Sequence, residues 1–437
     1  MEFLTNIPAL IKVSATFAII TFLMRLKISL GSALLAGSIL LGFWCALSPV
    51  QIATSMVRSI LDEKSIVLSL IVSLILVLSH SLEKTGHMQR LLDSFKGVSQ
   101  NVRLNLAVFP ALIGLLPMPG GAIFSAPMVD ALSKQESITP EQKTLINYWF
   151  RHVWEFSWPL YPGFILTCAL SGISVGNFFL AQFPLTLFML LVGYLGIIRP
   201  IPMLKESDRT YHRGSLTDFL VELFPILLVI CGSLIGGAVL HLLRGLWNGL
   251  EHLPKEFPLL LVLILSILWV WWKNGIDNIR EITQILINRS LVAMIFMILA
   301  IMIFQGILKD SNSISEISQS LIAGHVPIFL IVLVLPFIVG GVVGITIAFV
   351  GTTFPIIFSL LSSFGLHNEI FPYTILGFCA GYVGVLLSPL HVCLILTNAY
   401  FSTDLNRIYR FLWFPCTALM TAGIVSFFLS RLLFTIS

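Results

Sequence analysis

Three ionisable side chains lie close together in a stretch that is otherwise apolar and aromatic. Arg151, His152 and Glu155 occur within residues 148–156, which also hold two tryptophans and two phenylalanines. A charge at the centre of a membrane-spanning helix costs about 3 kcal/mol on insertion scales, so such residues are kept for ion pathways, proton relays or internal pairs. Arg151 and Glu155 are spaced i,i+4 and could form a structural ion pair in a helix. The functional interpretation makes Glu155 a proton carrier or a cation ligand.

Prolines interrupt two apolar helices near these groups, and each interruption frees backbone atoms. The prolines are Pro159, Pro162 and Pro389, and the carbonyls four residues before them belong to Glu155, Trp158 and Val385. Because proline has no N–H, these carbonyls are expected to lose their helical donors and to suit Na⁺ or a protonated water. The half-helix after each break presents free N–H groups, which suit a carboxylate or a phosphate. The alternative is that the prolines only kink their helices.

Two residues at matching places follow the prolines. His391 lies two residues after Pro389, and Tyr161 lies two residues after Pro159. Residues 370–402 contain no Asp, Glu, Lys or Arg, so His391 is the group there that titrates near neutral pH. We interpret Tyr161 as a substrate contact and His391 as a substrate or proton contact; the alternative for His391 is a neutral ring that donates to a nearby carbonyl.

Hydroxyl and amide groups near the same breaks are weaker candidates for substrate contacts. They are Ser125, Thr352, Thr353, Ser388 and Asn398. Each is weak by itself because serine and threonine often bond the carbonyls of their own helix.

Composition excludes most classes of protein that could use these residues. The 437-residue chain is 57% hydrophobic and 11% charged, whereas soluble domains carry about 25% charged residues. This deficit excludes a soluble enzyme, a nucleic-acid binder and a disordered scaffold, and it indicates a membrane protein of many spans. The six cysteines lie in apolar stretches without metal-ligand spacing, so we predict neither disulfides nor a zinc site. Residues 172–176 match the G-x-S-x-G pattern of hydrolases, but they lie in a turn between two spans and not between a strand and a helix.

Apolar runs long enough to cross about 30 Å of hydrocarbon predict ten spans. They are residues 5–24, 28–47, 65–82, 149–170, 176–198, 217–241, 257–272, 290–308, 371–391 and 408–430. Two further apolar regions, 104–133 and 327–362, are interrupted by glycine and proline, which predicts re-entrant hairpins. The first tip falls at residues 117–121, where Pro119, Gly120 and Gly121 are candidate substrate contacts. The second falls at residues 340–344 with 351–353.

The distribution of lysine and arginine supports the hairpins. If the N-terminus is outside and each hairpin enters and leaves on one side, the inside loops hold seventeen of these residues and the outside loops six. Treating one hairpin as a full span would destroy this positive-inside asymmetry. Both termini are then outside.

The same topology divides the chain into two halves of opposite orientation. A cytoplasmic linker at 201–216 separates residues 1–200 from residues 217–437, and each half has five spans and one hairpin. Landmarks recur between the halves: Pro110 and Pro336 lie 226 residues apart, as do Gly114 and Gly340, and Pro159 and Pro389 lie 230 apart. Inverted repeats with broken helices at the midplane are typical of secondary transporters.

This arrangement resembles a known group of membrane carriers. The segments Leu116-Pro117-Met118-Pro119-Gly120-Gly121-Ala122 and Ser388-Pro389-Leu390-His391 are similar to those of domain-of-unknown-function family 401, within the ion transporter superfamily of citrate, dicarboxylate, gluconate and arsenite carriers. The resemblance covers essentially the whole chain and implies a homodimeric, elevator-type carrier that couples an anion to a cation. The chain lacks the Ser-Asn-Thr of the dicarboxylate branch at both tips, so sodium coupling and a dicarboxylate substrate are not carried over.

The sequence therefore predicts an all-α polytopic protein of the inner (plasma) membrane that moves a small organic anion, coupled to H⁺ or Na⁺. Its expected partners are that anion, membrane lipid and a second copy of the chain, with no nucleic acid and no cofactor besides the candidate Na⁺. The alternative is a membrane-embedded enzyme that acts on a lipid-linked substrate with Glu155 and His391 as an acid–base pair. Paired breaks favour the transporter, because an enzyme needs only one catalytic cluster.

Overall fold

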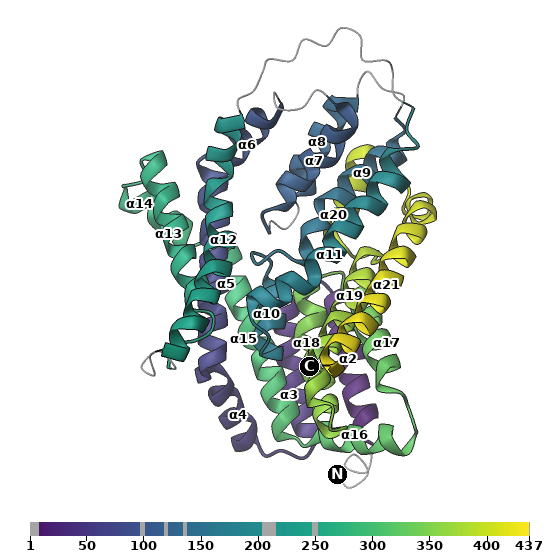
Figure 1. Ribbon diagram of the computed structural model, residues 1–437. Helices are drawn as coiled ribbons and strands as arrows, with labels where there is room; N and C mark the ends of the chain where they lie inside the picture. Colours follow the sequence, from purple (N-terminus) through teal and green to yellow (C-terminus); the bar gives the residue numbers. More distant parts are fainter. Residues whose placement is uncertain are drawn as a thin grey trace.

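The computed structural model describes residues 8–96, 101–117, 121–133, 138–202, 216–246 and 252–436, which are helices and connecting turns without a strand (Figure 1). The predicted all-α class is confirmed. Eight of the described helices are long and apolar enough to cross a membrane, as expected for a multi-pass membrane protein. They occupy Glu63–Lys84, Val175–Ile198, Leu216–Leu246, Phe257–Asn274, Ile279–Asp310, Thr346–Ser363, His367–Leu386 and Leu405–Leu433.

The described helices fall into two series, one on each side of residues 203–215. The first series is α2 (Ala9–Arg25), α3 (Leu30–Trp44), α4 (Pro49–Leu61), α5 (Glu63–Lys84), α6 (His87–Lys96), α7 (Val102–Gly114), α8 (Ala122–Ser133), α9 (Pro140–Arg151), η1 (Val153–Phe156), α10 (Pro162–Ser171), α11 (Val175–Gly193) and η2 (Tyr194–Ile198). The second series is α12 (Leu216–Leu246), α13 (Phe257–Asn274), α14 (Ile279–Leu286), α15 (Arg289–Asp310), α16 (Ser313–Ala323), α17 (Ile328–Val343), α18 (Thr346–Ser363), η4 (His367–Glu369), α19 (Ile370–Leu386), α20 (Val392–Phe401) and α21 (Leu405–Ile436).

The spacing of corresponding helices agrees with the offsets of the sequence landmarks. Helices α7 and α17 begin 226 residues apart (102 and 328), and α10 and α20 begin 230 apart (162 and 392). In Figure 1 the α7–α8 pair lies at the upper end of the molecule, and the α17–α18 pair lies toward the lower end. The division into two inverted repeats stays a prediction. Most of the expected linker, residues 203–215, lies outside the described residues.

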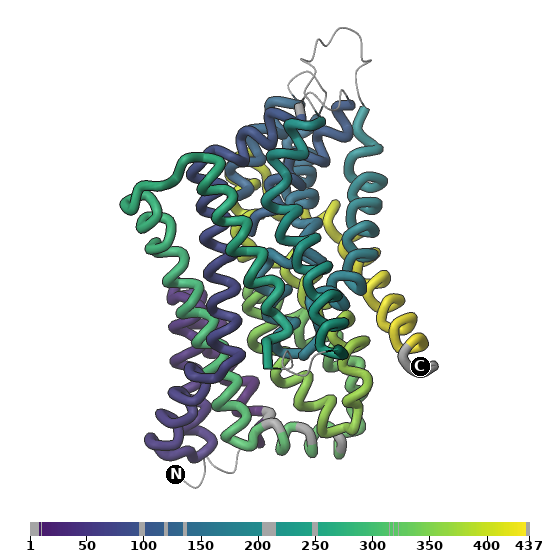
Figure 2. Tube along the Cα trace, turned by 60° about the vertical axis from the view of Figure 1, so that its left-hand side comes forward, coloured from purple at the N-terminus to yellow at the C-terminus, as the bar shows by residue number. Residues whose placement is uncertain are grey.

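Most helices pack into two groups. Helices α2 to α5 pack with one another and with α13 and α15, and α12 packs on α13; we call these helices, with α14, the scaffold group. Helices α7 to α11 pack with one another and with α17 to α21, which together form the hairpin group. The groups meet where α18 contacts α15, where α10 contacts α5, where α11 contacts α12 and where α17 contacts α2. Figure 2 shows the long helices of both groups running along the molecule.

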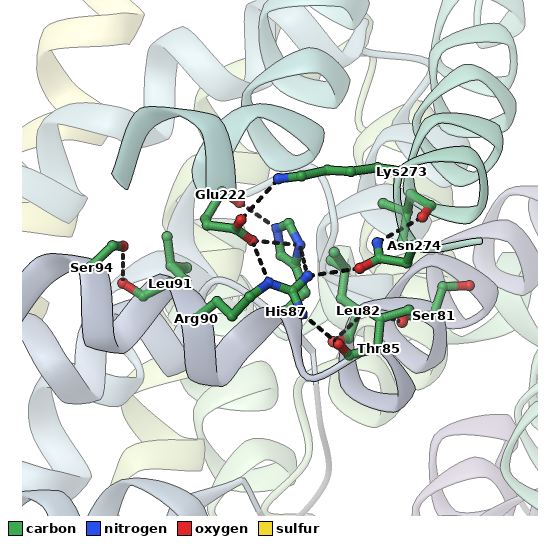
Figure 3. A network of polar contacts seen from close by, with 11 residues as sticks. Ser81, Leu82, Thr85, His87, Arg90, Leu91, Ser94, Glu222, Lys273 and Asn274 are labelled. Atoms are coloured by element: carbon green, nitrogen blue, oxygen red, sulfur yellow. Dashed lines mark hydrogen bonds and ion pairs between the residues drawn. The ribbon is translucent and has the colours of Figure 1, made fainter. Parts of the chain in front are cut away.

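A cluster of charged side chains joins α6, α12 and α13 (Figure 3). The Glu222 carboxylate is 2.8 Å from Lys273 Nζ, 3.3 Å from Arg90 Nε and 2.9 Å from His87 Nδ1. Arg90 also donates to Asn274 Oδ1 at 2.9 Å. The His87 side chain is fully buried, and that of Glu222 is 12% exposed. One carboxylate therefore joins three helices.

The break in the second hairpin falls in one of the two stretches that the sequence predicts, residues 340–344, and not in the other. Helix α17 ends at Val343 and α18 begins at Thr346, so the turn falls at Gly344, whose φ of +71° favours glycine. The predicted break at 351–353 is wrong, because these residues lie inside α18. A Cβ on Gly351 would lie 2.7 Å from the Ile301 side chain, so this glycine permits close packing between helices.

The second broken helix also extends further than predicted. Helix α19 ends at Leu386, and α20 runs from Val392 to Phe401, beyond the predicted span of 371–391. The short helices α4, α6, α14 and α16 have no counterpart among the predicted spans because their apolar runs are too short to cross a bilayer.

We predict that Glu222→Gln lowers the free energy of unfolding by about 2 kcal/mol, because it leaves Lys273 and Arg90 without their shared carboxylate. Unfolding of the detergent-purified protein measures this. The matched control is Glu141→Gln, which breaks an ion pair to Arg407, a side chain that is 71% exposed, and which should cost under about 1 kcal/mol. Equal losses in the two variants would show that the cluster adds no particular stability.

Candidate functional site

The two helix breaks meet at the centre of the hairpin group and complete each other's hydrogen bonds. Tyr148 of α9 donates its hydroxyl to the Leu386 carbonyl at the end of α19, at 2.9 Å. Tyr382 of α19 donates to the His152 carbonyl just after α9, at 2.5 Å. The last carbonyls of a helix have no donor within that helix. Each broken helix therefore supplies the donor that the other one needs.

The hairpins close on the breaks through a second matched pair of bonds. Tyr161 donates to the Gly114 carbonyl at the end of α7, at 2.6 Å, and His391 Nδ1 lies 2.9 Å from the Gly344 carbonyl that follows α17. Each bond joins residues 47 positions apart. Tyr161 and His391 each lie two residues after a proline, which predicts that they correspond to each other. The structure gives the two side chains equivalent hydrogen bonds in the two halves of the chain.

Glycines let the first hairpin contact the first break directly. A Cβ on Gly114 would lie 2.1 Å from the Arg151 carbonyl oxygen, and a Cβ on Gly121 would lie 2.2 Å from Arg151 Nη2. The guanidinium of Arg151 therefore lies against the residue that precedes α8. Arg151 is only 2% exposed, so this charge is inside the protein.

Glu155 connects the first break to the second hairpin. Its carboxylate accepts a 2.7 Å hydrogen bond from Thr346 Oγ1, at the first residue of α18. The N-terminus of a helix favours a negative charge, so this position suits an ionised carboxylate. The structural alternative, an ion pair between Glu155 and Arg151, stays a prediction. Helix α9 ends at Arg151, so the i,i+4 spacing no longer places the two side chains on one helical face.

A pair of histidines lies between the two breaks. His152 Nε2 and His391 Nε2 are 2.9 Å apart, and His152 Nδ1 is 2.5 Å from the Tyr148 carbonyl. His152 is fully buried and His391 is 7% exposed. Cys393 lies beside them, with all three potential ligand atoms within 4.8 Å of one another.

Three helix N-termini point into the same region. Helices α10, α18 and α20 begin at Pro162, Thr346 and Val392, and their N-cap residues form no side-chain capping bond. A Cβ on Gly163 would lie 2.8 Å from Thr346, which places the starts of α10 and α18 side by side. Uncapped N–H groups at a helix start, with about half a positive charge, form a favourable place for an anion.

Comparison with known protein families identifies the family of this chain. Residues 9–430 match the family described as "Protein of unknown function (DUF401)". The chain belongs to the DUF401 family. The match confirms the family that the sequence motifs indicated. No curated protein matches this sequence.

Among solved structures, this DUF401 protein is similar to the YdaH transporter of Alcanivorax borkumensis, whose crystal structure is described as revealing an unusual topology. The two share 14% sequence identity and a TM-score of 0.59, over 86% of each chain. At this identity the likeness establishes a common fold.

The structure of this DUF401 protein brings some of the predicted site residues together. Gly121, Glu155, Tyr161, Ser388 and His391 all take part in the contacts between hairpins and breaks, and Ser388 Oγ accepts from the Leu390 N–H at 3.2 Å. Ser125 lies one turn into α8, with its hydroxyl 3.4 Å from the Ala122 carbonyl. Pro119 and Gly120 lie outside the described residues.

Other predicted residues lie further along their helices. Thr352 and Thr353 are six and seven residues past the start of α18 and bond the carbonyls of Ala348 and Phe349. Asn398 lies near the far end of α20, where it accepts from Thr403.

Two of the three backbone carbonyls that the sequence predicts to be free at the breaks, those of Trp158 and Val385, accept hydrogen bonds from nearby N–H groups. The Trp158 carbonyl accepts from the Tyr161 N–H at 3.0 Å, and the Val385 carbonyl accepts from the Ser388 N–H at 3.1 Å. The turns after each helix close on these atoms, so the expectation that they lose their donors is wrong. A Na⁺ ion there would have only the remaining lone pair of each oxygen, and its binding stays a prediction.

Several residues of the centre were not in the predicted site. They are Asn147, Tyr148, His152, Thr346, Tyr382 and Cys393. Thr346 would have followed from a break placed at Gly344, because it is then the first residue of the next helix. Nothing in the sequence indicates that His152 meets His391, 239 residues away.

We predict that Gly114→Ala lowers the free energy of unfolding by about 2–3 kcal/mol, because its Cβ would overlap the Arg151 carbonyl, a backbone atom that cannot rotate away. Unfolding of the purified protein measures the change. Gly237→Ala is the control, since Gly237 lies in α12 with nothing within 4 Å of an added Cβ and alanine favours helix there. If Gly114→Ala were as stable as Gly237→Ala, the close contact between α7 and the first break would be wrong.

Proposed function

We propose that this protein is a secondary active transporter that moves a small anion across the membrane, coupled to H⁺ or Na⁺, by elevator-type alternating access. One observation carries the proposal: both hairpins and both helix breaks meet at one buried point that holds Arg151, Glu155 and three uncapped helix N-termini. Discontinuous helices that meet midway along the molecule are how many secondary transporters build their substrate sites. The shared fold with a protein described as a transporter supports the same conclusion.

The charge balance of the centre favours an anion. Each helix N-terminus contributes about half a positive charge, and Arg151 contributes a full one. Glu155 opposes these with one negative charge, and Thr346 already donates to it. The remaining positive potential suits a carboxylate or a phosphate, and the sequence resemblance to carriers of organic anions favours a carboxylate.

The division of the helices into two groups supports the proposed elevator mechanism. All the broken helices and hairpin arms belong to the hairpin group, which meets the scaffold group through few helices. A cavity of about 380 Å³ lies along this boundary, between α10 and α18 on one side and α15 and α16 on the other. Polar side chains line it, among them Gln305, Lys309 and Ser362. We propose that the hairpin group slides along this boundary with its bound anion.

The second candidate is a membrane-embedded enzyme with Glu155 and His391 as acid and base. In the structure both residues have other partners: Glu155 binds Thr346, and His391 lies against His152 and the Gly344 carbonyl. The matched geometry of the two halves is needed for transport and is not needed for catalysis. We therefore favour transport.

The test of the proposal is gradient-driven uptake. Citrate, succinate, gluconate and other labelled organic anions are first ranked by thermal stabilisation of the purified protein, because a ligand that binds the native state raises its stability. The best ones are then offered to proteoliposomes under a pH or Na⁺ gradient. We expect accumulation that collapses when an ionophore removes the gradient. Chemical conversion of an added compound without accumulation would support the enzyme.

We predict that Glu155→Gln reduces uptake at least about tenfold, an effect of roughly 1.4 kcal/mol or more, while shifting thermal unfolding little. Glutamine keeps the size of the side chain and can still accept from Thr346 Oγ1, but it has no charge to titrate. Initial rates of uptake measure the effect. Glu369→Gln, which removes a pair to the half-exposed Arg431, serves as the control. Unchanged uptake and pH dependence in Glu155→Gln would make Glu155 a structural residue.

A further inference from the structure

The two central histidines form three hydrogen-bond contacts in a row, and His152 also forms a hydrogen bond with the Cys393 side chain. His152 Nδ1 faces the Tyr148 carbonyl at 2.5 Å, the two Nε2 atoms face each other at 2.9 Å, and His391 Nδ1 faces the Gly344 carbonyl at 2.9 Å. Carbonyl oxygens only accept hydrogen bonds, so each of the outer contacts needs a hydrogen on Nδ1. The central contact needs a hydrogen on one Nε2.

A count of hydrogens shows that neutral rings cannot satisfy this row. Three contacts require three hydrogens, and two neutral imidazoles carry only two. Any neutral arrangement therefore leaves two lone pairs pointing at each other within 3 Å, in a region where His152 is fully buried. One additional positive species between the rings removes the conflict.

The distance between the rings favours a proton as that species. A separation of 2.9 Å between the Nε2 atoms is a normal length for an N–H···N hydrogen bond. A tetrahedral Zn²⁺ with metal–nitrogen bonds near 2.0–2.1 Å would hold the two nitrogens about 3.4 Å apart. The nearby Cys393 sulfur is a soft metal ligand. A metal ion held by His152, His391 and Cys393 is therefore the competing explanation.

We propose that His152 and His391 bind one proton jointly, shared between their Nε2 atoms, and that this pair is the proton site that couples to the transported anion. Binding adds H⁺ and changes the charge of the pair from zero to +1, with no covalent bond broken. The coupling part of the proposal rests on the proposed transport function, whereas the shared proton does not.

The groups around the pair link proton binding to anion binding. Arg151 and Tyr148 face it from α9, Glu155 from η1, Tyr382 from α19 and Cys393 from α20. The positive charge of Arg151 opposes a second cation in the centre, whereas Glu155 favours it. An anion bound at the helix N-termini would tip this balance toward the protonated pair. Because linkage is reciprocal, the proton would also strengthen anion binding, which predicts symport of the two.

Proton loading would also hold the hairpin against the break. His391 joins the Gly344 turn to the start of α20, and His152 lies next to the end of α9. The protonated pair attracts these two elements to each other across the Nε2 contact. The unprotonated pair leaves facing lone pairs at one of the three contacts, so loss of the proton weakens the junction between the two breaks.

The shared proton can be tested without any knowledge of the substrate. The full-length protein with ¹⁵N-labelled histidine is reconstituted in lipid bilayers and followed by solid-state NMR from about pH 5 to about pH 9, which brackets ordinary histidine titration. We expect a through-hydrogen-bond coupling between two Nε2 nuclei, and both rings changing protonation at the same pH. Two rings that titrate independently, or no Nε2–Nε2 coupling at any pH, would overturn the proposal.

Matched variants assign the signals among the nine histidines. His391→Asn keeps a side-chain N–H for the Gly344 carbonyl but has no atom in the Nε2 position, so it should fold and lose the coupling. His367→Asn changes an exposed histidine of η4 and should keep it. Retention of the coupling in His391→Asn would overturn the assignment.

Two further measurements separate this proposal from its competitors. Zn²⁺ should bind the wild-type protein no more tightly than it binds Cys393→Ser. If the wild-type protein has a Zn²⁺ site that is lost in both Cys393→Ser and His391→Asn, the pair holds a metal ion and the shared proton is overturned. Addition of citrate to weakly buffered protein should take up about one proton per anion bound, and His391→Asn should take up none. Equal proton uptake in the two proteins would overturn the coupling role. If the nitrogen coupling is present but none of the tested anions binds, the shared proton stands and the proposed anion transport fails.

Discussion

The requirement that every backbone carbonyl inside an apolar region finds a donor determines the centre of this molecule. Breaking two membrane helices leaves carbonyls at Leu386 and just after α9, and ending two hairpin arms leaves carbonyls at Gly114 and Gly344. Three phenols and one imidazole meet these four acceptors. Because each donor comes from a different segment from its acceptor, these four bonds hold the half-helices and the hairpins together as one unit.

The same arrangement concentrates positive potential where the segments meet. Helices that are satisfied at their C-terminal ends still present free N–H groups at their starts, and three of those starts lie in the centre. Arg151 adds a full charge, and glycine at positions 114 and 121 allows the backbone to approach it. Glu155 offsets part of this potential from the start of α18. The anion site that we propose would therefore be a consequence of how the breaks are capped, and it would not require a dedicated set of polar side chains.

Much of the fold could be predicted from the sequence, because hydrophobic length and proline position act locally. The apolar runs predicted the long helices and both hairpin regions, and the proline spacing paired Tyr161 with His391. The predictions failed where tertiary packing overrode local sequence rules such as helical spacing and glycine content. Helical spacing would place Arg151 and Glu155 on one helical face, but α9 ends at Arg151. Gly351 resembled a break residue, but it makes room for Ile301. The contact between His152 and His391 joins two halves of the chain, and no periodicity encodes it.

The exchange of tyrosines between the halves also constrains how the protein is made. Residues of the first half enter the membrane while the second half is still being synthesised, so the carbonyl after α9 has no Tyr382 to bind and the Tyr148 hydroxyl has no Leu386. In hydrocarbon an unpaired polar group costs several kcal/mol. The first broken helix would therefore have to wait in contact with water, with the insertion machinery or in a continuous helical form. Its final shape can be reached only after α19 has been inserted, which makes late insertion of the second half the step that completes the first.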